Sequence, residues 1–231
     1  YPLGADGAPP GRDLESRPMK LRELVDGAGV DAEIRGDADA EITGLAYDSR
    51  RAGAGTLFFC VPGEKADGHD FAPSAVEAGA AALVVERPLG LDAVEVQVAD
   101  ARAAMAPLAA TFSGAPTEEL KMAGVTGTNG KTTTCFLIRS LLEASGQPCG
   151  LLGTVQQVVG GDAEDVERTT PEAIDLQATF ARMLEAGDRA CVMEVSSHAL
   201  VLHRADAINF DVKVFTNLTQ DHLDFHDGME D

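Results

Sequence analysis

Short apolar runs alternate with helical stretches along most of this chain. The predicted strands span residues 42–46, 56–61, 81–85, 94–98, 121–126, 150–155, 190–195 and 212–217. The predicted helices span residues 16–28, 70–78, 100–112, 131–145 and 171–186. Residues 158–168 are polar and predict a loop. The strands at 81–85, 121–126, 190–195 and 212–217 are expected to be buried. Helices that alternate with short strands indicate an α/β layered fold.

Local signals place some of the helix ends and a domain boundary. Asp70 is predicted to cap the helix at 70–78, and Thr170 the helix at 171–186. Pro107 is expected either to kink the helix at 100–112 or to mark its true start. The stretch 113–117 contains Ser, Gly and Pro and predicts a boundary between domains over 19–116 and 117–231. Residues 1–18 carry glycine, proline and charge with little to bury, which predicts a disordered tail.

Composition excludes some classes of partner. The 231 residues include 18 Lys and Arg against 38 Asp and Glu, a net charge of −20. This balance argues against binding to nucleic acid or to an anionic membrane surface, and no apolar run is long enough to span a bilayer. The four cysteines form no C-x-x-C pair, so we expect free thiols in a reducing cytoplasm.

The most informative stretch is a glycine-rich loop between a predicted strand and a predicted helix. Gly127 and Gly130 flank a turn, and Lys131 and Thr132 open the helix. This arrangement is typical of a phosphate cradle, in which the lysine reaches the β- and γ-phosphates of ATP and the hydroxyl binds Mg²⁺. The strict pattern requires glycine at 125, where this chain has Val125; a chance Gly-Lys-Thr turn is the alternative.

Two strand ends carry further chemistry. Glu194 lies in an apolar strand, so it is either a Mg²⁺ ligand or the partner of a buried arginine. The segment 216–226 contains His222 among acidic residues, which fits either a solvated surface turn or a ligand of a second metal ion.

Together these motifs resemble those of the ATP-dependent Mur ligases. The central motifs are GTNGKTT at 127–133, EVSSHAL at 194–200 and TNLTQDHLD at 216–224. The earlier motifs YDSR at 47–50, GTLFF at 55–59 and GEKADGHDF at 63–71 resemble the UDP-binding domain of the branch that makes UDP-N-acetylmuramoyl-tripeptide. The likeness implies a small N-terminal α/β UDP-binding domain followed by a truncated P-loop α/β ATPase domain.

The resemblance implies a reaction and a set of site residues. ATP would phosphorylate the D-Glu carboxylate of UDP-N-acetylmuramoyl-L-Ala-D-Glu, and the amine of diaminopimelate or lysine would then form the amide. The implied catalytic residues are Lys131, Glu194 and His222, and the implied metal ligands are Thr132, Glu194 and His222. The implied ATP-binding residues are Gly127, Thr128, Asn129, Gly130, Lys131, Thr132 and Thr133.

The implied substrate contacts fall into two groups. Tyr47, Ser49, Glu64, Lys65 and Ala66 correspond to contacts with the uridine nucleotide. The muramoyl-dipeptide contacts are Arg168, Thr169, Thr170, Ser196 and Arg204.

Family members carry a carbamylated lysine shortly after the Asp-His motif, whereas the last lysine here is Lys213. The resemblance therefore implies an N-terminal fragment that is inactive alone. Two other functions fit parts of the sequence: a UDP-sugar or nucleotide-binding module without ligation, and a regulatory P-loop switch. The hypothesis of a regulatory switch does not explain the YDSR motif at 47–50 or the domain that carries it.

Overall fold

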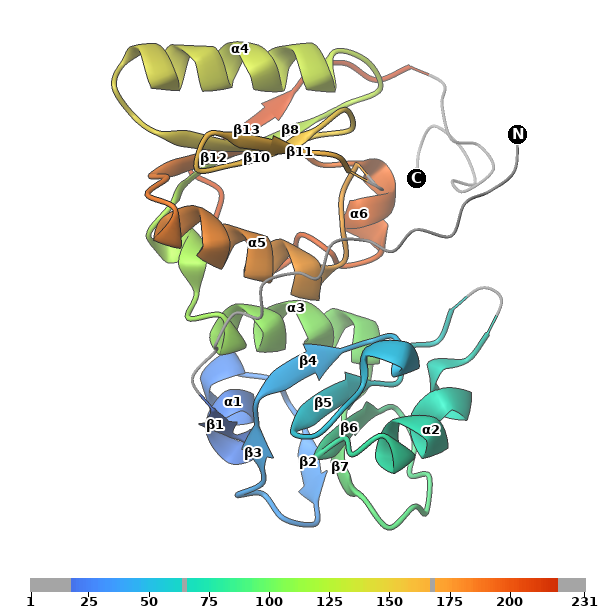
Figure 1. Cartoon of the computed structure of the whole chain (residues 1–231). Helices are drawn as coiled ribbons and strands as arrows, with labels where there is room; N and C mark the ends of the chain where they lie inside the picture. The colour runs from blue at the N-terminus through green and yellow to red at the C-terminus, as the bar shows by residue number, and fades with distance from the viewer. Residues whose placement is uncertain (1–17, 64–65, 167–168, 220–231) are drawn as a thin grey trace, which may run out of the picture.

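The computed structural model describes residues 18–63, 66–166 and 169–219, which form two α/β units stacked through helices (Figure 1). The elements of the first unit are β1 (Met19–Lys20), α1 (Leu21–Ala28), β2 (Glu33–Arg35), β3 (Glu41–Ile42), β4 (Gly44–Ala46), β5 (Thr56–Phe59), α2 (Ala72–Glu77), β6 (Ala82–Val85), β7 (Val94–Gln97) and α3 (Ala101–Phe112). Short 3₁₀ turns lie at Ser49–Arg51, Gly68–Phe71 and Pro116–Glu118.

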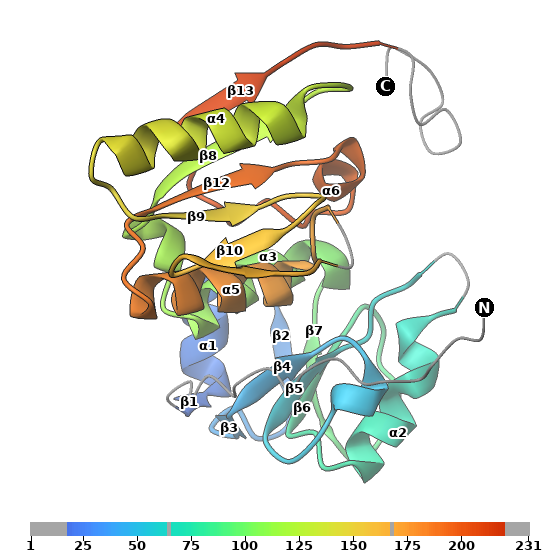
Figure 2. The same cartoon turned by 45° about the horizontal axis from the view of Figure 1, so that its top comes forward.

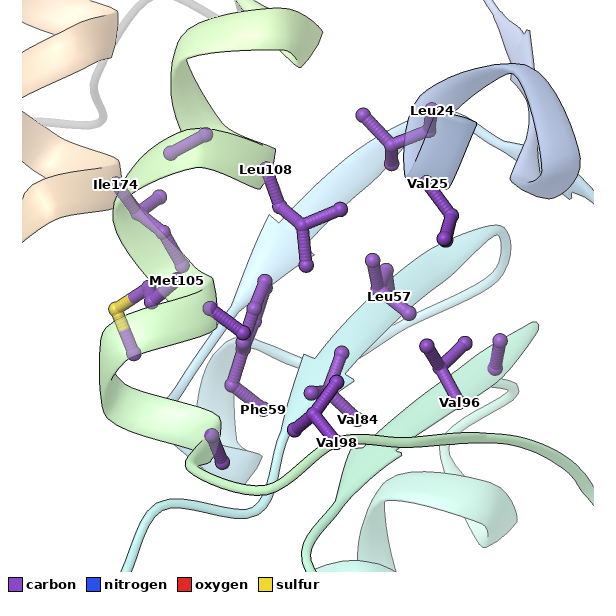
Figure 3. Close-up of a cluster of buried hydrophobic side chains, with 14 of the residues drawn as sticks. Leu24, Val25, Leu57, Phe59, Val84, Val96, Val98, Met105, Leu108 and Ile174 are labelled. Atoms are coloured by element: carbon purple, nitrogen blue, oxygen red, sulfur yellow. The ribbon is translucent and has the colours of Figure 1, made fainter. Parts of the chain in front are cut away.

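The first unit is built on a sheet with strand order β2-β7-β6-β5-β4, in which only β2 runs antiparallel to its neighbour. Alternate residues of β5 face opposite layers, because successive side chains of a strand point to opposite faces. Leu57 and Phe59 pack under α1 and α3 in the core of Figure 3, whereas Phe58 packs under α2. Both faces of the sheet are therefore covered, as a mostly parallel sheet requires.

The second unit repeats this layering. Its elements are β8 (Lys121–Thr126), α4 (Lys131–Ala144), β9 (Cys149–Leu152), β10 (Gln157–Val159), β11 (Asp162–Glu164), α5 (Ala173–Glu185), β12 (Ala190–Glu194), α6 (Ser197–Val201) and β13 (Val212–Phe215). The sheet order is β11-β10-β9-β12-β8-β13, and β9, β12, β8 and β13 are parallel. The helices α4 and α5 lie on opposite faces of this sheet (Figure 2).

Three expectations about elements are wrong. Residues 158–168 contain the hairpin β10–β11 rather than only a loop, and Gly160 and Gly161 form its turn with positive φ. The first residue before α5 is Glu172, so Thr170 is not its cap, and the hydroxyl of Thr170 instead bonds to the carbonyl of Glu194. Asp70 is not a cap either, because it lies inside a 3₁₀ turn that is capped by Asp67.

Two further predictions concern Pro107 and the last strand. Pro107 does not start its helix, because α3 begins after its cap Asp100 and continues past Pro107 to Phe112. The strand β13 forms as expected but it is exposed rather than buried, since it pairs only with β8 among the described residues. No helix within the described ranges is long and apolar enough to cross a membrane.

The two units meet where α3 packs against α5 (Figures 1 and 2). Ile174, at the start of α5, inserts into the core of the first unit beside Met105 and Leu108 (Figure 3). The apolar core of the first unit is therefore continuous with the first turn of a helix from the second.

Candidate functional site

The glycine-rich loop lies between the carboxyl end of β8 and the start of α4. Gly127 and Gly130 have φ of 126° and 87°, values that favour glycine. A Cβ atom at Gly127 would lie 2.3 Å from the Thr216 hydroxyl oxygen, so the close approach also requires glycine. The Lys131 ammonium turns back into the loop and donates to the carbonyl oxygens of Gly127 at 2.6 Å and Thr128 at 3.0 Å.

The departure from the strict phosphate-loop pattern has a packing cause. Gly124 lies within β8, and a Cβ atom there would come within 2.6 Å of the Phe210 ring. Val125, where the pattern expects glycine, is fully buried in the core beneath α4. Gly124 therefore serves the packing of Phe210, and the turn of the loop depends on Gly127 and Gly130.

Residues that follow β13 hold this loop in place. The Asn217 carbonyl accepts from the N–H of Thr128, and its side-chain oxygen accepts from the N–H of Asn129, both at 3.0 Å. The Thr216 hydroxyl donates to the Asn129 carbonyl at 2.7 Å. The sequence motif at 216–217 thus braces the phosphate loop, a role that its residues alone did not predict.

Glu194 ends β12 and is only 1% exposed. Its Oε1 accepts from the backbone N–H of Thr154 at 2.9 Å, and its Oε2 accepts from the Thr154 hydroxyl at 3.1 Å. No lysine or arginine in the described part of the chain forms an ion pair with it. This geometry does not favour the interpretation of Glu194 as the partner of a buried arginine.

Glu194 and the phosphate loop belong to adjacent strand ends. In the parallel register of β12 and β8, Glu194 lies opposite Val125, two residues before Gly127. Burial, followed by the Glu194 carboxylate, raises the pKa of the nearby Cys135 thiol to about 12, while the Lys131 ammonium acts in the opposite direction. Both charges therefore lie near the same thiol on α4, at the edge of the sheet where parallel α/β proteins bind ligands.

The donor set at this edge fits Mg²⁺. Thr132 supplies a hydroxyl in the first turn of α4, and Glu194 supplies a carboxylate from the neighbouring strand. Mg²⁺ in nucleotide sites is held by one or two protein ligands together with phosphates and water. Within the described residues, no group of three His, Cys, Asp or Glu side chains suited to a metal occurs.

The predicted dipeptide contacts gather around Glu194. The Thr170 hydroxyl donates to the Glu194 carbonyl at 3.1 Å and lies 3.5 Å from the Ser196 hydroxyl. The Thr169 hydroxyl lies 3.2 Å from that of Thr154. Arg204 donates to the Thr170 carbonyl at 3.1 Å. Four residues predicted from separate motifs therefore form one cluster beside the phosphate loop.

The predicted uridine contacts lie at the carboxyl end of β4 and in the loop after β5. Ser49 begins a 3₁₀ turn that is capped by Asp48, and Tyr47 donates its hydroxyl to Asp175 of α5 at 2.8 Å. Ala66 is exposed. Predicted residues that lie outside the described part of the chain are Glu64, Lys65, Arg168 and His222.

Sequence reasoning missed two polar residues of the site. Thr154 fixes both oxygens of Glu194, and it was missed because the strand was predicted over 150–155, whereas β9 ends at Leu152 and leaves Thr154 in the following turn. Glu172 is buried and accepts from Arg204 at 2.6 Å; its signal was an acid two residues beyond the Thr-Thr pair.

Comparison with known families divides the chain in the same way as the fold. Residues 41–113 match a family model described as Mur ligase family, catalytic domain. Residues 125–231 match a model described as Mur ligase middle domain. Each match falls within one half of the chain and includes most of the elements of one α/β unit.

Two similar curated relatives carry the same name. UDP-N-acetylmuramoyl-L-alanyl-D-glutamate--2,6-diaminopimelate ligase of Geobacillus kaustophilus is 52% identical over 191 residues, which are 83% of this chain and 39% of the relative. The protein of the same name from Listeria monocytogenes is 46% identical over 92% of this chain and 43% of its own length. The chain thus spans about two fifths of the curated relatives that it matches.

Solved structures agree on the fold. A structure titled as UDP-N-acetylmuramoyl-L-alanyl-D-glutamate--2,6-diaminopimelate ligase superposes with a TM-score of 0.76 and 25% identity, covering 92% of this chain and 43% of that one. MurF from Acinetobacter baumannii follows with a TM-score of 0.65 at 22% identity over 94% of this chain and 45% of that one. The second likeness supports the arrangement of the two units only.

Proposed function

Because the chain belongs to the Mur ligase family through its N-terminal and middle domains, we propose that it supplies the nucleotide sites of an ATP-dependent ligase. The substrate would be UDP-N-acetylmuramoyl-L-alanyl-D-glutamate, and the incoming amino acid 2,6-diaminopimelate, as in the names of the relatives. The reaction belongs to the synthesis of peptidoglycan precursors. The four cysteines are all free and buried, which agrees with a cytoplasmic location.

One observation carries this proposal. Glu194, held by Thr154 at the end of β12, lies beside the phosphate loop and shares its strand end with the cluster of Thr170 and Ser196. A carboxylate that could hold Mg²⁺, a glycine-rich loop and a group of hydroxyls thus meet at one edge of the sheet. Phosphoryl transfer needs charge neutralisation and positioning of both reactants, and this edge offers both.

The loop residues would act on ATP. Lys131 would exchange its contacts with the Gly127 and Thr128 carbonyls for oxygens of the β- and γ-phosphates. The backbone N–H groups at the start of α4 would bind the same phosphates. Mg²⁺ held by Thr132 and Glu194 would neutralise charge on the transferring group, and His222 would bind a second ion.

The other residues would orient the acceptor. Tyr47, Ser49 and the loop at 64–66 would bind the uridine nucleotide, while Thr169, Thr170, Ser196, Arg204 and Arg168 would bind the muramoyl-dipeptide. The D-Glu carboxylate would then attack the γ-phosphorus of ATP and release ADP. The amine of diaminopimelate would attack the resulting acyl phosphate, so that an amide forms, inorganic phosphate leaves and a proton is released.

The test uses protein from the complete reading frame that carries these residues. We expect Glu194→Gln to lower ATP-dependent tripeptide formation by about 100-fold or more, because a charged ligand at the transferring phosphate is lost. The melting temperature should change little, since the amide oxygen can still accept from Thr154. Glu185→Gln, an exposed position on α5, is the matched control and should ligate normally.

Three results would contradict the proposal or part of it. Normal ligation by Glu194→Gln would make Glu194 a structural residue. Global unfolding of that variant would support a structural charge instead of a metal ligand. Wild-type protein that binds UDP-muramoyl-dipeptide and ATP but forms no amide with diaminopimelate or lysine would support the binding-module alternative.

A further inference from the structure

The first turn of α5 lies at the contact between the two domains. Ala173 and Ile174 are buried in the core of the N-terminal domain. Figure 3 shows Ile174 in this position. A charged residue flanks this apolar pair on each side: Glu172 precedes it and Asp175 follows it. Thr170, a predicted dipeptide contact, precedes Glu172 by two residues, so this turn is contiguous with the site.

Asp175 bonds to two side chains of the N-terminal domain. Its Oδ2 accepts from the Tyr47 hydroxyl at 2.8 Å, and its Oδ1 accepts from Arg51 at 3.1 Å. Burial raises the pKa of Tyr47, and the Asp175 and Glu172 carboxylates raise it further, so the hydroxyl stays protonated as a donor. Both donors lie at the carboxyl end of β4, where the uridine contacts are proposed.

Glu172 bonds to one arginine from each domain. Its Oε2 accepts from Arg102 of α3 at 3.3 Å, and its Oε1 accepts from Arg204 at 2.6 Å. Arg204 in turn donates to the Thr170 carbonyl, and Thr170 donates to the Glu194 carbonyl. A continuous series of hydrogen bonds therefore connects α3 of the N-terminal domain to the strand end that carries Glu194.

We propose that Glu172 and Asp175 are positioning residues that fix the orientation of the two domains, so that one UDP-muramoyl-dipeptide is held by both. The inference rests on the proposed function above. The apolar contact of Ile174 holds the domains together but is not directional, whereas ion pairs at defined atoms fix a register. With the domains fixed, binding of the uridine end brings the dipeptide end directly to Thr170 and Arg204, which raises its effective concentration.

The experiment compares two ligands on the same protein. UDP alone would contact only the N-terminal domain, whereas UDP-N-acetylmuramoyl-L-Ala-D-Glu would reach both. We expect Arg102→Leu to weaken binding of the full substrate by about tenfold and to leave the dissociation constant of UDP within about twofold. Arg102→Lys should recover most of the loss, because it restores a cation opposite Glu172.

Arg182→Leu is the matched control. Arg182 lies on α5, the helix that begins after Glu172, but it pairs with Glu164 inside its own domain. If Arg102→Leu does not fold, Arg102→Gln removes the same charge while keeping a polar side chain opposite Glu172, and it should give the same selective loss. Isothermal titration calorimetry measures both constants, and a melting curve shows that each variant is folded.

The outcomes separate the two ideas. Equal weakening of UDP and substrate, or an unchanged substrate dissociation constant in Arg102→Leu and Arg102→Gln, would overturn the positioning role. Wild-type protein that binds neither UDP nor the substrate would overturn the proposed function itself. A loss of equal size in Arg182→Leu would show that any change of charge on these helices acts in the same way, which also overturns the positioning role.

Discussion

At the scale of single residues, Asp67 ties together the loop after β5. Its Oδ1 accepts from the backbone N–H of His69 at 3.0 Å and from Nδ1 of that ring at 2.6 Å, and its Oδ2 accepts from Arg87 at 2.7 Å. His69 Nε2 accepts from the N–H of Glu86 at 3.0 Å, which assigns the ring proton to Nδ1. The backbone N–H of His69, then the Arg87 and His69 side chains, hold the pKa of Asp67 well below its usual range.

This network predicts a stability contribution that depends on pH. A carboxyl whose pKa is lower in the folded state stabilises the protein above the unfolded value of about 3.9, and the contribution is lost as pH falls towards the folded pKa. We expect Asp67→Asn to lower the melting temperature by a few degrees at pH 7, with a smaller difference at pH 3. Asp70→Asn, at an exposed position, is the control. A deficit that is independent of pH would contradict this assignment.

The residues of the site show what a sequence can and cannot supply at this scale. Lys131, Thr132 and Glu194 could be proposed from the sequence because each stands at a strand end or helix start whose chemistry is local. The roles of Thr154 and Asn217 were not predicted because they depend on partners 40 and 88 residues away along the chain. Side chains that orient a site across strands carry no local pattern, so the sequence alone gives no reason to select them.

At the scale of elements, the hairpin β10–β11 gives a direct test of its turn. Gly160 and Gly161 have φ of 59° and 89°, as a type I′ turn requires. A Cβ atom at Gly160 would lie 2.6 Å from the Cβ of Ala186, whereas one at Gly161 would meet nothing within 4 Å. Both alanine variants adopt the left-handed conformation at a cost of roughly 1–2 kcal/mol, and only Gly160→Ala adds a steric clash.

We therefore expect Gly160→Ala to lower the free energy of unfolding more than Gly161→Ala does. Urea unfolding followed by circular dichroism measures the difference between the two variants. Equal losses would mean that the contact with Ala186 relaxes without cost. A larger loss for Gly161→Ala would show that the turn has another geometry.

The elements that were predicted correctly share a strong local signal. The strand β8 occupies residues 121–126 as expected, and α4 ends where Gly146 adopts a left-handed φ of 82°. The hairpin was missed because polar residues such as Asp162 and Glu164 outweighed the Gly-Gly turn that its strands flank. Exposed hairpin strands need few apolar residues, so hydrophobic periodicity is a weak guide to them.

At the scale of the whole molecule, the two units differ in how completely their apolar side chains are covered. In the N-terminal unit both faces of the sheet are packed, and Phe71 is its one large hydrophobic residue with marked exposure among the described positions. In the second unit Leu141 of α4 and Phe215 of β13 are 72% and 63% exposed. The second unit therefore buries less apolar area around α4 and β13, which lowers the cost of local opening there.

This asymmetry predicts a gradient of amide protection. β13 has one hydrogen-bonded neighbour within the described residues, whereas β12 is paired on both sides by β8 and β9. We expect amides of β13 to exchange at least about tenfold faster than those of β12, because an edge strand opens without disrupting the rest of the sheet. Hydrogen exchange followed by mass spectrometry on the 231-residue chain measures both segments, with the central strands β5 and β6 as the protected reference. Slower exchange in β13 than in β12 would contradict the edge assignment, and equal protection of the two units would show that exposed apolar surface does not govern opening in this protein.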